Sequence, residues 1–193
     1  MNLTDSLKNQ IITNDTSLGT LHLHAQLYGQ ILSDDDVVEL AHLLCYNSSV
    51  IHIDLSQNGI INNGAICLAE TLKVNTSITH IDLGHNSISD EGIYSIANVL
   101  CSNSTLTDLT LNGNKFGEKG ALALSESLRT NSSLMYLGLN HNDIGDRGVI
   151  AIAKSLIFNY TLEWIGLMGI QNRDEKCWDT VKIMLQSNTT LKK

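Results

Sequence analysis

The sequence predicts an α/β solenoid in which a short β-strand and an α-helix alternate along the chain. Three observations support this fold class. One apolar pattern returns every 28 residues, each copy opens with alternating apolar residues, and each continues with apolar residues at helical spacing. Because no single copy can bury both of its apolar stripes alone, the copies must stack.

The start of each central copy predicts a strand and a turn. In the copy that begins at Val50, Ile53 and Leu55 point inward from a short strand, because alternate side chains face opposite sides. Asn58 follows, and its side-chain amide can satisfy backbone groups that no sheet partner reaches. The other central copies begin at Ile78, Leu106 and Leu134, with Asn86, Asn114 and Asn142 at the turn.

The second half of each copy predicts a helix. Gly64 is followed four and eight residues later by Leu68 and Leu72, which share one helical face. A sequon then ends the copy, as at Asn75. Sequons recur in phase at Asn47, Asn75, Asn103, Asn131 and Asn159. This phase predicts helix-ending asparagines in the left-handed conformation rather than glycosylation sites.

The two ends depart from the repeat. The first copy begins at Leu18 and carries about four extra residues before a helix expected over 36–46, and a capping helix is expected around 3–12. The last copy has Ile170 in place of the turn asparagine. We therefore predict a capping segment over 1–17 and a repeat domain over 18–191, divided into 18–49, 50–77, 78–105, 106–133, 134–161 and 162–190.

Composition narrows the function. The formal net charge is −8, with only 12 Lys and Arg, which argues against nucleic-acid binding. The sequence has no apolar run long enough to predict a membrane span. We also identify no secretory leader in its first residues. The four cysteines lack metal-type spacing and are typical of reduced thiols. We expect a cytoplasmic protein without cofactor or metal that is monomeric when free.

The consensus LxxLxLxxNxIxxxGxxxLAxxLxxNxS, which covers roughly residues 18–190, resembles the ribonuclease-inhibitor-like class of leucine-rich repeats. The resemblance implies a curved horseshoe with a parallel β-sheet on its concave face and α-helices on its convex face. It also implies a non-enzymatic protein-binding scaffold. Members of this class include ribonuclease inhibitor, sensor domains of immune receptors and bacterial effectors.

Residues between the inward leucines then form columns on the concave face. His and Asp dominate the first repeats, whereas Tyr136 and Trp164 lie together in the last, beside Gly138 and Gly166. The glycines predict a shallow groove with an aromatic wall that anchors a partner. Alternatively, the rings merely cover the last repeat. The predicted partner-binding residues are His22, His24, His52, Asp54, His80, Asp82, His85, Asp108, Thr110, Asn112, Met135, Tyr136, Asn140, His141, Trp164 and Met168.

The histidines leave three alternatives open: ordinary interface groups, groups that tune affinity with pH, and metal ligands. The Asp54 and Asp82 carboxylates could also form an acid/base pair. Our leading hypothesis is a module that binds a folded protein with a basic or mixed surface and blocks that partner's active site. The alternatives are a bacterial effector in the host cytosol, a metal-binding or hydrolytic protein, and a fragment of a larger receptor.

Overall fold

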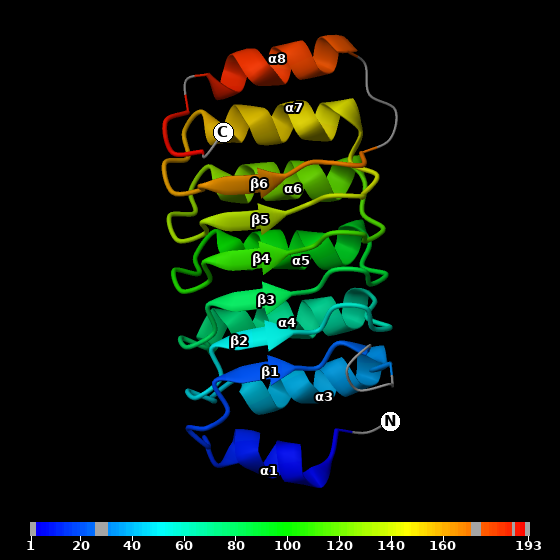
Figure 1. Cartoon of the computed structure of the whole chain (residues 1–193), viewed down its shortest axis with the longest axis vertical. Helices are drawn as coiled ribbons and strands as arrows, with labels where there is room; N and C mark the ends of the chain where they lie inside the picture. Colours follow the sequence, from blue (N-terminus) through cyan, green and yellow to red (C-terminus); the bar gives the residue numbers. More distant parts are fainter. Residues whose placement is uncertain (1–2, 26–30, 171–174, 187, 192–193) are drawn as a thin grey trace.

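The computed structural model describes residues 3–25, 31–170, 175–186 and 188–191, and it contains one parallel sheet backed by helices (Figure 1). The strands are β1 (Thr20–His22), β2 (His52–Asp54), β3 (His80–Asp82), β4 (Asp108–Thr110), β5 (Tyr136–Gly138) and β6 (Trp164–Gly166). The helices are α1 (Asp5–Ile12), α3 (Asp34–Leu44), α4 (Asn62–Val74), α5 (Asp90–Leu100), α6 (Glu118–Leu128), α7 (Gly145–Leu156) and α8 (Glu175–Leu185).

The strands pair in chain order, β1 to β6, and every neighbouring pair is parallel. The predicted α/β solenoid is therefore confirmed. The register is the one the repeat requires: Ile53 lies beside Ile81, and Ile81 beside Leu109. A residue and its counterpart 28 positions on thus lie side by side on adjacent strands.

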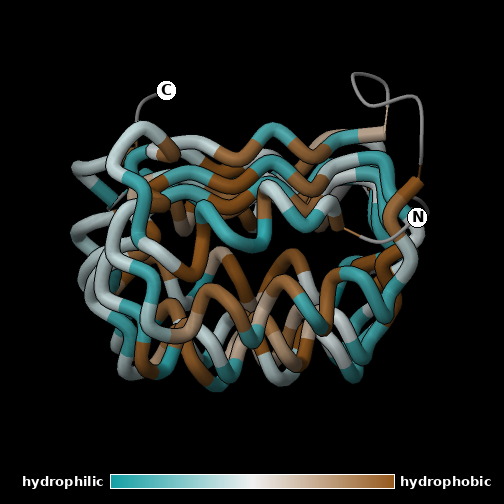
Figure 2. Tube along the Cα trace, turned by 90° about the horizontal axis from the view of Figure 1, so that it is seen from below, coloured by the Kyte–Doolittle hydropathy of each residue, from teal (hydrophilic) through white to brown (hydrophobic). Residues whose placement is uncertain are grey.

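The core lies between the sheet layer and the helix layer, which Figure 2 shows from one end of the stack. Strand residues such as Ile53 and Leu55 and helix residues such as Leu68 and Leu72 are buried there. The mid-repeat glycines allow adjacent helices to approach. A Cβ added to Gly148 would lie 2.8 Å from the Cβ of Ala121 on the preceding helix.

The turn asparagines act as predicted. The Asn86 Nδ2 donates to the carbonyl oxygens of Leu55 and Leu83, and its Oδ1 accepts from the backbone N–H groups of Asn58 and Ile60. Asn58, Asn114 and Asn142 repeat this pattern in part. The amides thus link each repeat to its neighbours where the strands end.

The prediction for the sequon asparagines was wrong in its conformation. Asn75 has φ −74° and ψ 130°, and no sequon asparagine among the described residues has a positive φ. Its Nδ2 instead donates to the Leu44 and Asn47 carbonyl oxygens, while its Oδ1 accepts from the N–H groups of Ser77 and Ile78. Asn75 is only 3% exposed, so a glycan could not be accommodated in the folded chain.

The ends show two further differences. The first-repeat helix α3 begins at Asp34 rather than Asp36, because Ser33 and Asp36 form a reciprocal capping box. At the N-terminal end, α1 begins at Asp5, where the Thr4 side chain accepts from the Leu7 N–H. The extra residues of the first repeat fall mainly on 26–30, outside the described part of the chain.

Candidate partner-binding surface

The face of the sheet that the helices do not cover carries the predicted columns, and we call it the sheet face (Figure 1). The first column runs Thr20, His52, His80, Asp108, Tyr136 and Trp164, and the second runs His22, Asp54, Asp82, Thr110, Gly138 and Gly166. Because each strand residue pairs with the next member of its column, side chains about 4.8 Å apart line the face. The sequence thus placed these residues correctly relative to one another.

Seven of the predicted site residues line one shallow hollow of about 340 Å³, which we call the His/Asp hollow. Its lining residues are Thr20, His22, His52, Ile53, Asp54, His80, Ile81, Asp82, Asp108 and Thr110. They come from the first four strands. The hollow is therefore a product of strand pairing, since its members lie up to 90 residues apart in the chain.

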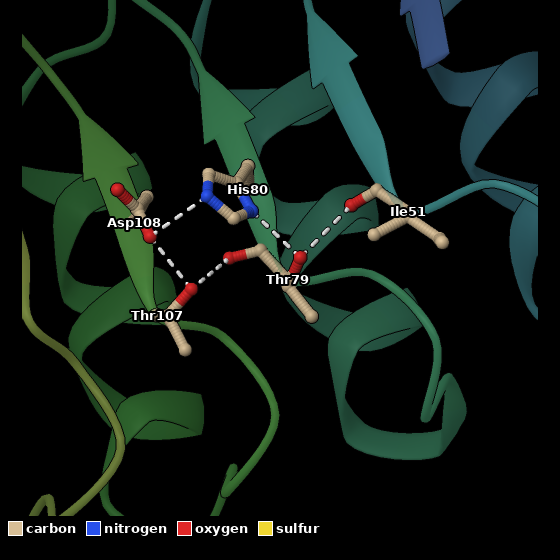
Figure 3. Close-up of polar contacts among 5 residues, drawn as sticks. All are labelled: Ile51, Thr79, His80, Thr107 and Asp108. Carbon is tan, nitrogen blue, oxygen red and sulfur yellow. Dashed lines mark hydrogen bonds and ion pairs between the residues drawn. The ribbon is translucent and has the colours of Figure 1, made fainter. Parts of the chain in front are cut away.

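A chain of polar contacts orders one rim of this hollow (Figure 3). The His80 Nε2 lies 3.0 Å from the Asp108 Oδ2, and its Nδ1 lies 2.6 Å from the Thr79 Oγ1. The Asp108 Oδ2 also accepts a 2.6 Å hydrogen bond from the Thr107 hydroxyl. On the other side, the His52 ring packs edge-on against His80, with centroids 4.1 Å apart. These contacts hold the His80 ring in one orientation.

Thr79 and Thr107 were not among the predicted site residues. Both precede a first-column residue, and the Thr107 hydroxyl donates to the Thr79 carbonyl oxygen as well as to Asp108. The sequence contained a pattern that could have identified them. Thr-His at 79–80 and Thr-Asp at 107–108 occupy the same repeat position, so a hydroxyl precedes a column residue in both repeats. A hydroxyl beside an imidazole or carboxylate is a common orienting partner.

The order carboxylate, imidazole, hydroxyl in Asp108, His80 and Thr79 invites comparison with a nucleophilic triad. Such a site also needs free N–H donors for an oxyanion. Here the Thr79 and His80 N–H groups both donate to the Ile51 carbonyl oxygen, and the Thr107 and Asp108 N–H groups donate to that of Thr79. The geometry therefore gives the hydrolytic alternative no support at this position.

The metal-binding alternative also gains no support from the described ranges. In them, no three His, Cys, Asp or Glu side chains are grouped so that they could hold an ion. Asp54 and Asp82, the suggested acid/base pair, instead terminate their strands. The Asp54 Oδ1 accepts from the Ser56 N–H and hydroxyl, and the Asp82 Oδ1 accepts from the Gly84 N–H. Burial raises the pKa of the Asp82 carboxyl, with the Asp54 charge adding to the rise and the Gly84 hydrogen bond opposing it.

His52 should make folding stability depend on pH. Burial lowers the pKa of its imidazole, His80 and His22 act in the same direction, and Asp108 opposes them. The unfolded chain, with a histidine pKa of about 6.5, therefore binds the proton first as the pH falls. We expect the free energy of unfolding to decrease as the pH falls from about 6.5 towards the folded-state pKa.

Urea unfolding of the wild type and of the His52→Gln variant, at several pH values between about 7.5 and about 5.5, measures this effect. The wild type should lose more stability than the variant over this interval. Equal losses would assign the pH dependence to other groups. The comparison of two proteins removes the contribution of Asp82, which is common to both.

The turn histidines lie apart from the His/Asp hollow. His85 and His141 have φ of 55° and 57°, the left-handed conformation that Gly113 and Gly169 adopt at the same repeat position. Each ring lies over the next repeat's glycine: a Cβ on Gly113 would lie 2.6 Å from the His85 Nδ1. His85 and His24 nevertheless act electrostatically on Asp82, where both lower the pKa of the carboxyl. Both turn histidines are exposed and accessible to a partner.

The aromatic end of the sheet face differs from its prediction. Tyr136 and Trp164 lie side by side on β5 and β6, 38% and 41% exposed. The expected space beside the rings is filled, because Asn112 lies where a Gly138 Cβ would be, and Asn140 and the Trp164 ring lie where a Gly166 Cβ would be. Asparagine side chains thus occupy the space next to both glycines. Met168 is 71% exposed beside the aromatic wall, whereas Met135 is half-buried.

Comparison with known proteins agrees with this architecture. The family model described as "Leucine Rich repeat" matches residues 46–69, 74–97, 102–125 and 130–153. The chain is a leucine-rich repeat protein. Many solved structures share its fold, and two of them show the likeness. One is titled "Leiomodin-1 Actin-Binding Site 2 (ABS2)", with a TM-score of 0.62 and 22% identity over 97% of this chain and 90% of that chain.

The other is a Caenorhabditis elegans tropomodulin C-terminal domain, with a TM-score of 0.59 and 15% identity over 96% of this chain and 93% of that chain. No curated protein matches this leucine-rich repeat protein in sequence. Within the described residues, none of its helices has the length and apolar character needed to cross a membrane. Repeat domains of this kind serve as protein-interaction modules, with the partner set by the exposed columns.

Proposed function

We propose that this protein binds one folded protein partner through its sheet face. The observation that supports this proposal is a continuous column of side chains that crosses five adjacent strands. Its members are His52, Tyr136 and Trp164, which are exposed, and His80 and Asp108, which are half-buried. Aromatic side chains on a rigid sheet lose little entropy on binding and are enriched among residues that dominate interface energies. A rigid face with such residues at one end and hydrogen-bonding groups at the other suits a protein surface.

The partner's contact surface should be basic or mixed. Asp54, Asp82 and Asp108 line the His/Asp hollow, and the chain as a whole carries a formal net charge of −8. Lysine or arginine side chains entering the hollow would pair with these carboxylates and would be steered there during association. The polar end then sets orientation, and the aromatic end contributes most of the affinity.

Replacing Trp164 or Tyr136 with alanine should weaken partner binding by at least about 2 kcal/mol each if they are binding hot spots. Tyr160→Ala is the matched control, because Tyr160 is 67% exposed and lies outside the strands. Affinity capture from native cells with the three variants identifies partners, and calorimetry with the purified partner gives the affinities. A partner bound equally by all three variants would place the site away from the sheet face.

Actin is a second candidate partner, because one solved structure of this fold is titled as an actin-binding site. Cosedimentation of the protein with filamentous actin and native gels with monomeric actin test it directly. Actin binding that is lost in the Trp164→Ala variant would support both actin as the partner and the sheet face as the binding surface. Failure to bind actin leaves the sheet-face proposal to be decided by the captured partner.

Blocking of an enzyme partner is the finer form of the proposal, and an effector role in a host cytosol stays a prediction from the resemblance. Inhibition requires that the bound partner present its active site to the sheet face. Assay of a captured enzyme with and without the protein decides this point. Loss of inhibition in Trp164→Ala, but not in Tyr160→Ala, is the expected result.

A further inference from the structure

The helix layer carries an apolar stripe that lies outside the predicted binding residues. Each helix from α3 to α8 has an apolar residue at one shared repeat position, and successive helices pack side by side (Figure 1). These residues, which we call the helix stripe, are Val38, Ile66, Tyr94, Leu122, Ile150 and Trp178. Tyr94 and Leu122 are 67% and 42% exposed, and the other four are half-buried.

A hollow of about 290 Å³ lies at the middle of the stripe, between α5 and α6. Tyr94, Ala97, Asn98, Cys101, Ala123, Glu126 and Ser127 line it. Most of this lining is carbon. A row of exposed and half-buried apolar side chains with a hollow at its centre is the kind of surface that a protein partner covers.

Charged residues flank the stripe, and their sign changes along it. Three positions before the stripe residue stand Asp35 and Glu91 in the first half and Lys119 and Arg147 in the second, where Glu175 on α8 is the exception. Four positions after it, Glu70 and Glu126 are followed by Lys154 and Lys182. Glu70, Glu91, Lys119 and Lys154 are all exposed. At these two positions the charges on α4 and α5 are therefore acidic, and those on α6 and α7 are basic apart from Glu126.

We infer that the helix stripe binds a second copy of this chain in antiparallel orientation. A twofold axis between α5 and α6 would place α5 against α6 of the second copy, and α4 against its α7. Glu91 would then face Lys119 of the second copy, and Glu70 would face its Lys154. A twofold interface uses the same patch on both copies, so a surface with one acidic and one basic half is complementary to itself.

This inference replaces the expectation of a free monomer and is independent of the sheet face, which stays open in the dimer. Sedimentation velocity over protein concentrations from about 1 µM to about 500 µM should show a monomer–dimer equilibrium. Tyr94→Glu should raise the dimer Kd at least about tenfold, while Tyr160→Glu leaves it unchanged. Circular dichroism confirms that both variants are folded. A wild-type protein that remains monomeric throughout overturns the inference.

A charge exchange tests the antiparallel arrangement itself. Glu91→Lys and Lys119→Glu should each weaken self-association, because like charges then meet twice in the interface. The double variant should return to within about twofold of the wild-type Kd. An equimolar mixture of the two single variants should form heterodimers more tightly than either forms homodimers. A mixture that associates no better than its components would overturn the antiparallel pairing.

Discussion

Replacing Asn86 with alanine is expected to destabilise the solenoid by about 3 kcal/mol or more. The side chain is buried, and its Oδ1 accepts from the N–H groups of Asn58 and Ile60 at 3.2 and 3.1 Å. Its Nδ2 donates to three carbonyl oxygens, those of Leu55, Leu83 and Gly84. Alanine would leave the Asn58 and Ile60 N–H groups without their acceptor, and each such group costs about 1–3 kcal/mol. The three carbonyl oxygens keep other donors, the Asn58 and Asn114 side-chain amides and the Gln57 N–H.

Urea unfolding followed by circular dichroism measures this loss, with Asn98→Ala as the control. Asn98 is an exposed asparagine of α5, so its replacement should change the free energy of unfolding by no more than about 0.5 kcal/mol. An Asn86→Ala protein as stable as the control would mean that water satisfies the turn. A reduced slope of the transition would indicate that the repeats on either side unfold separately.

Phe116→Ala should cost about 3–5 kcal/mol, the range typical of a buried aromatic replaced by alanine. The Phe116 side chain is fully buried at the repeat position where the other regular repeats have Ile60, Ile88 and Ile144. A cavity in the middle of the stack weakens the contacts with both neighbouring repeats. Phe116→Ile should recover most of the loss, because isoleucine fills this position in three repeats.

Phe158→Ala is the matched control for Phe116→Ala. Its ring is 58% exposed and lies 5.6 Å from the Arg129 guanidinium, a cation–π contact at the surface. Its removal should cost below about 1 kcal/mol. Chemical denaturation of the three variants under one set of conditions gives the comparison. Equal effects at the two phenylalanines would contradict the burial difference between them.

Most of the fold followed from the sequence because the repeat encodes it redundantly. Ile53 and Leu55 identify a strand only weakly, but their recurrence at a constant spacing identifies the strand, its neighbour and its register together. The same constancy predicts that His52, His80 and Asp108 lie in one column, because they share a repeat position. Elements at the ends were less well predicted, as with α3, where a local capping box decided the start.

The errors arose where side chains from different repeats compete for the same space. The groove beside Tyr136 was predicted from Gly138, but Asn112 of the preceding repeat fills that space. Asn75 was predicted to adopt a left-handed conformation, but hydrogen bonds to the preceding repeat hold it extended. A single repeat contains neither contact. Thr79 was overlooked for the same reason, since its importance depends on the His80 ring turned towards it.

The sequence by itself determined the repeat, the pairing of strands and the membership of each column, because a constant period leaves one register that buries the recurring apolar strand residues. Only the tertiary structure decided which members of the columns meet. It joined His52, His80 and Asp108 into one contact chain and filled the space over Gly138. These outcomes depend on side-chain directions and packing between repeats, which a pattern along one chain does not specify.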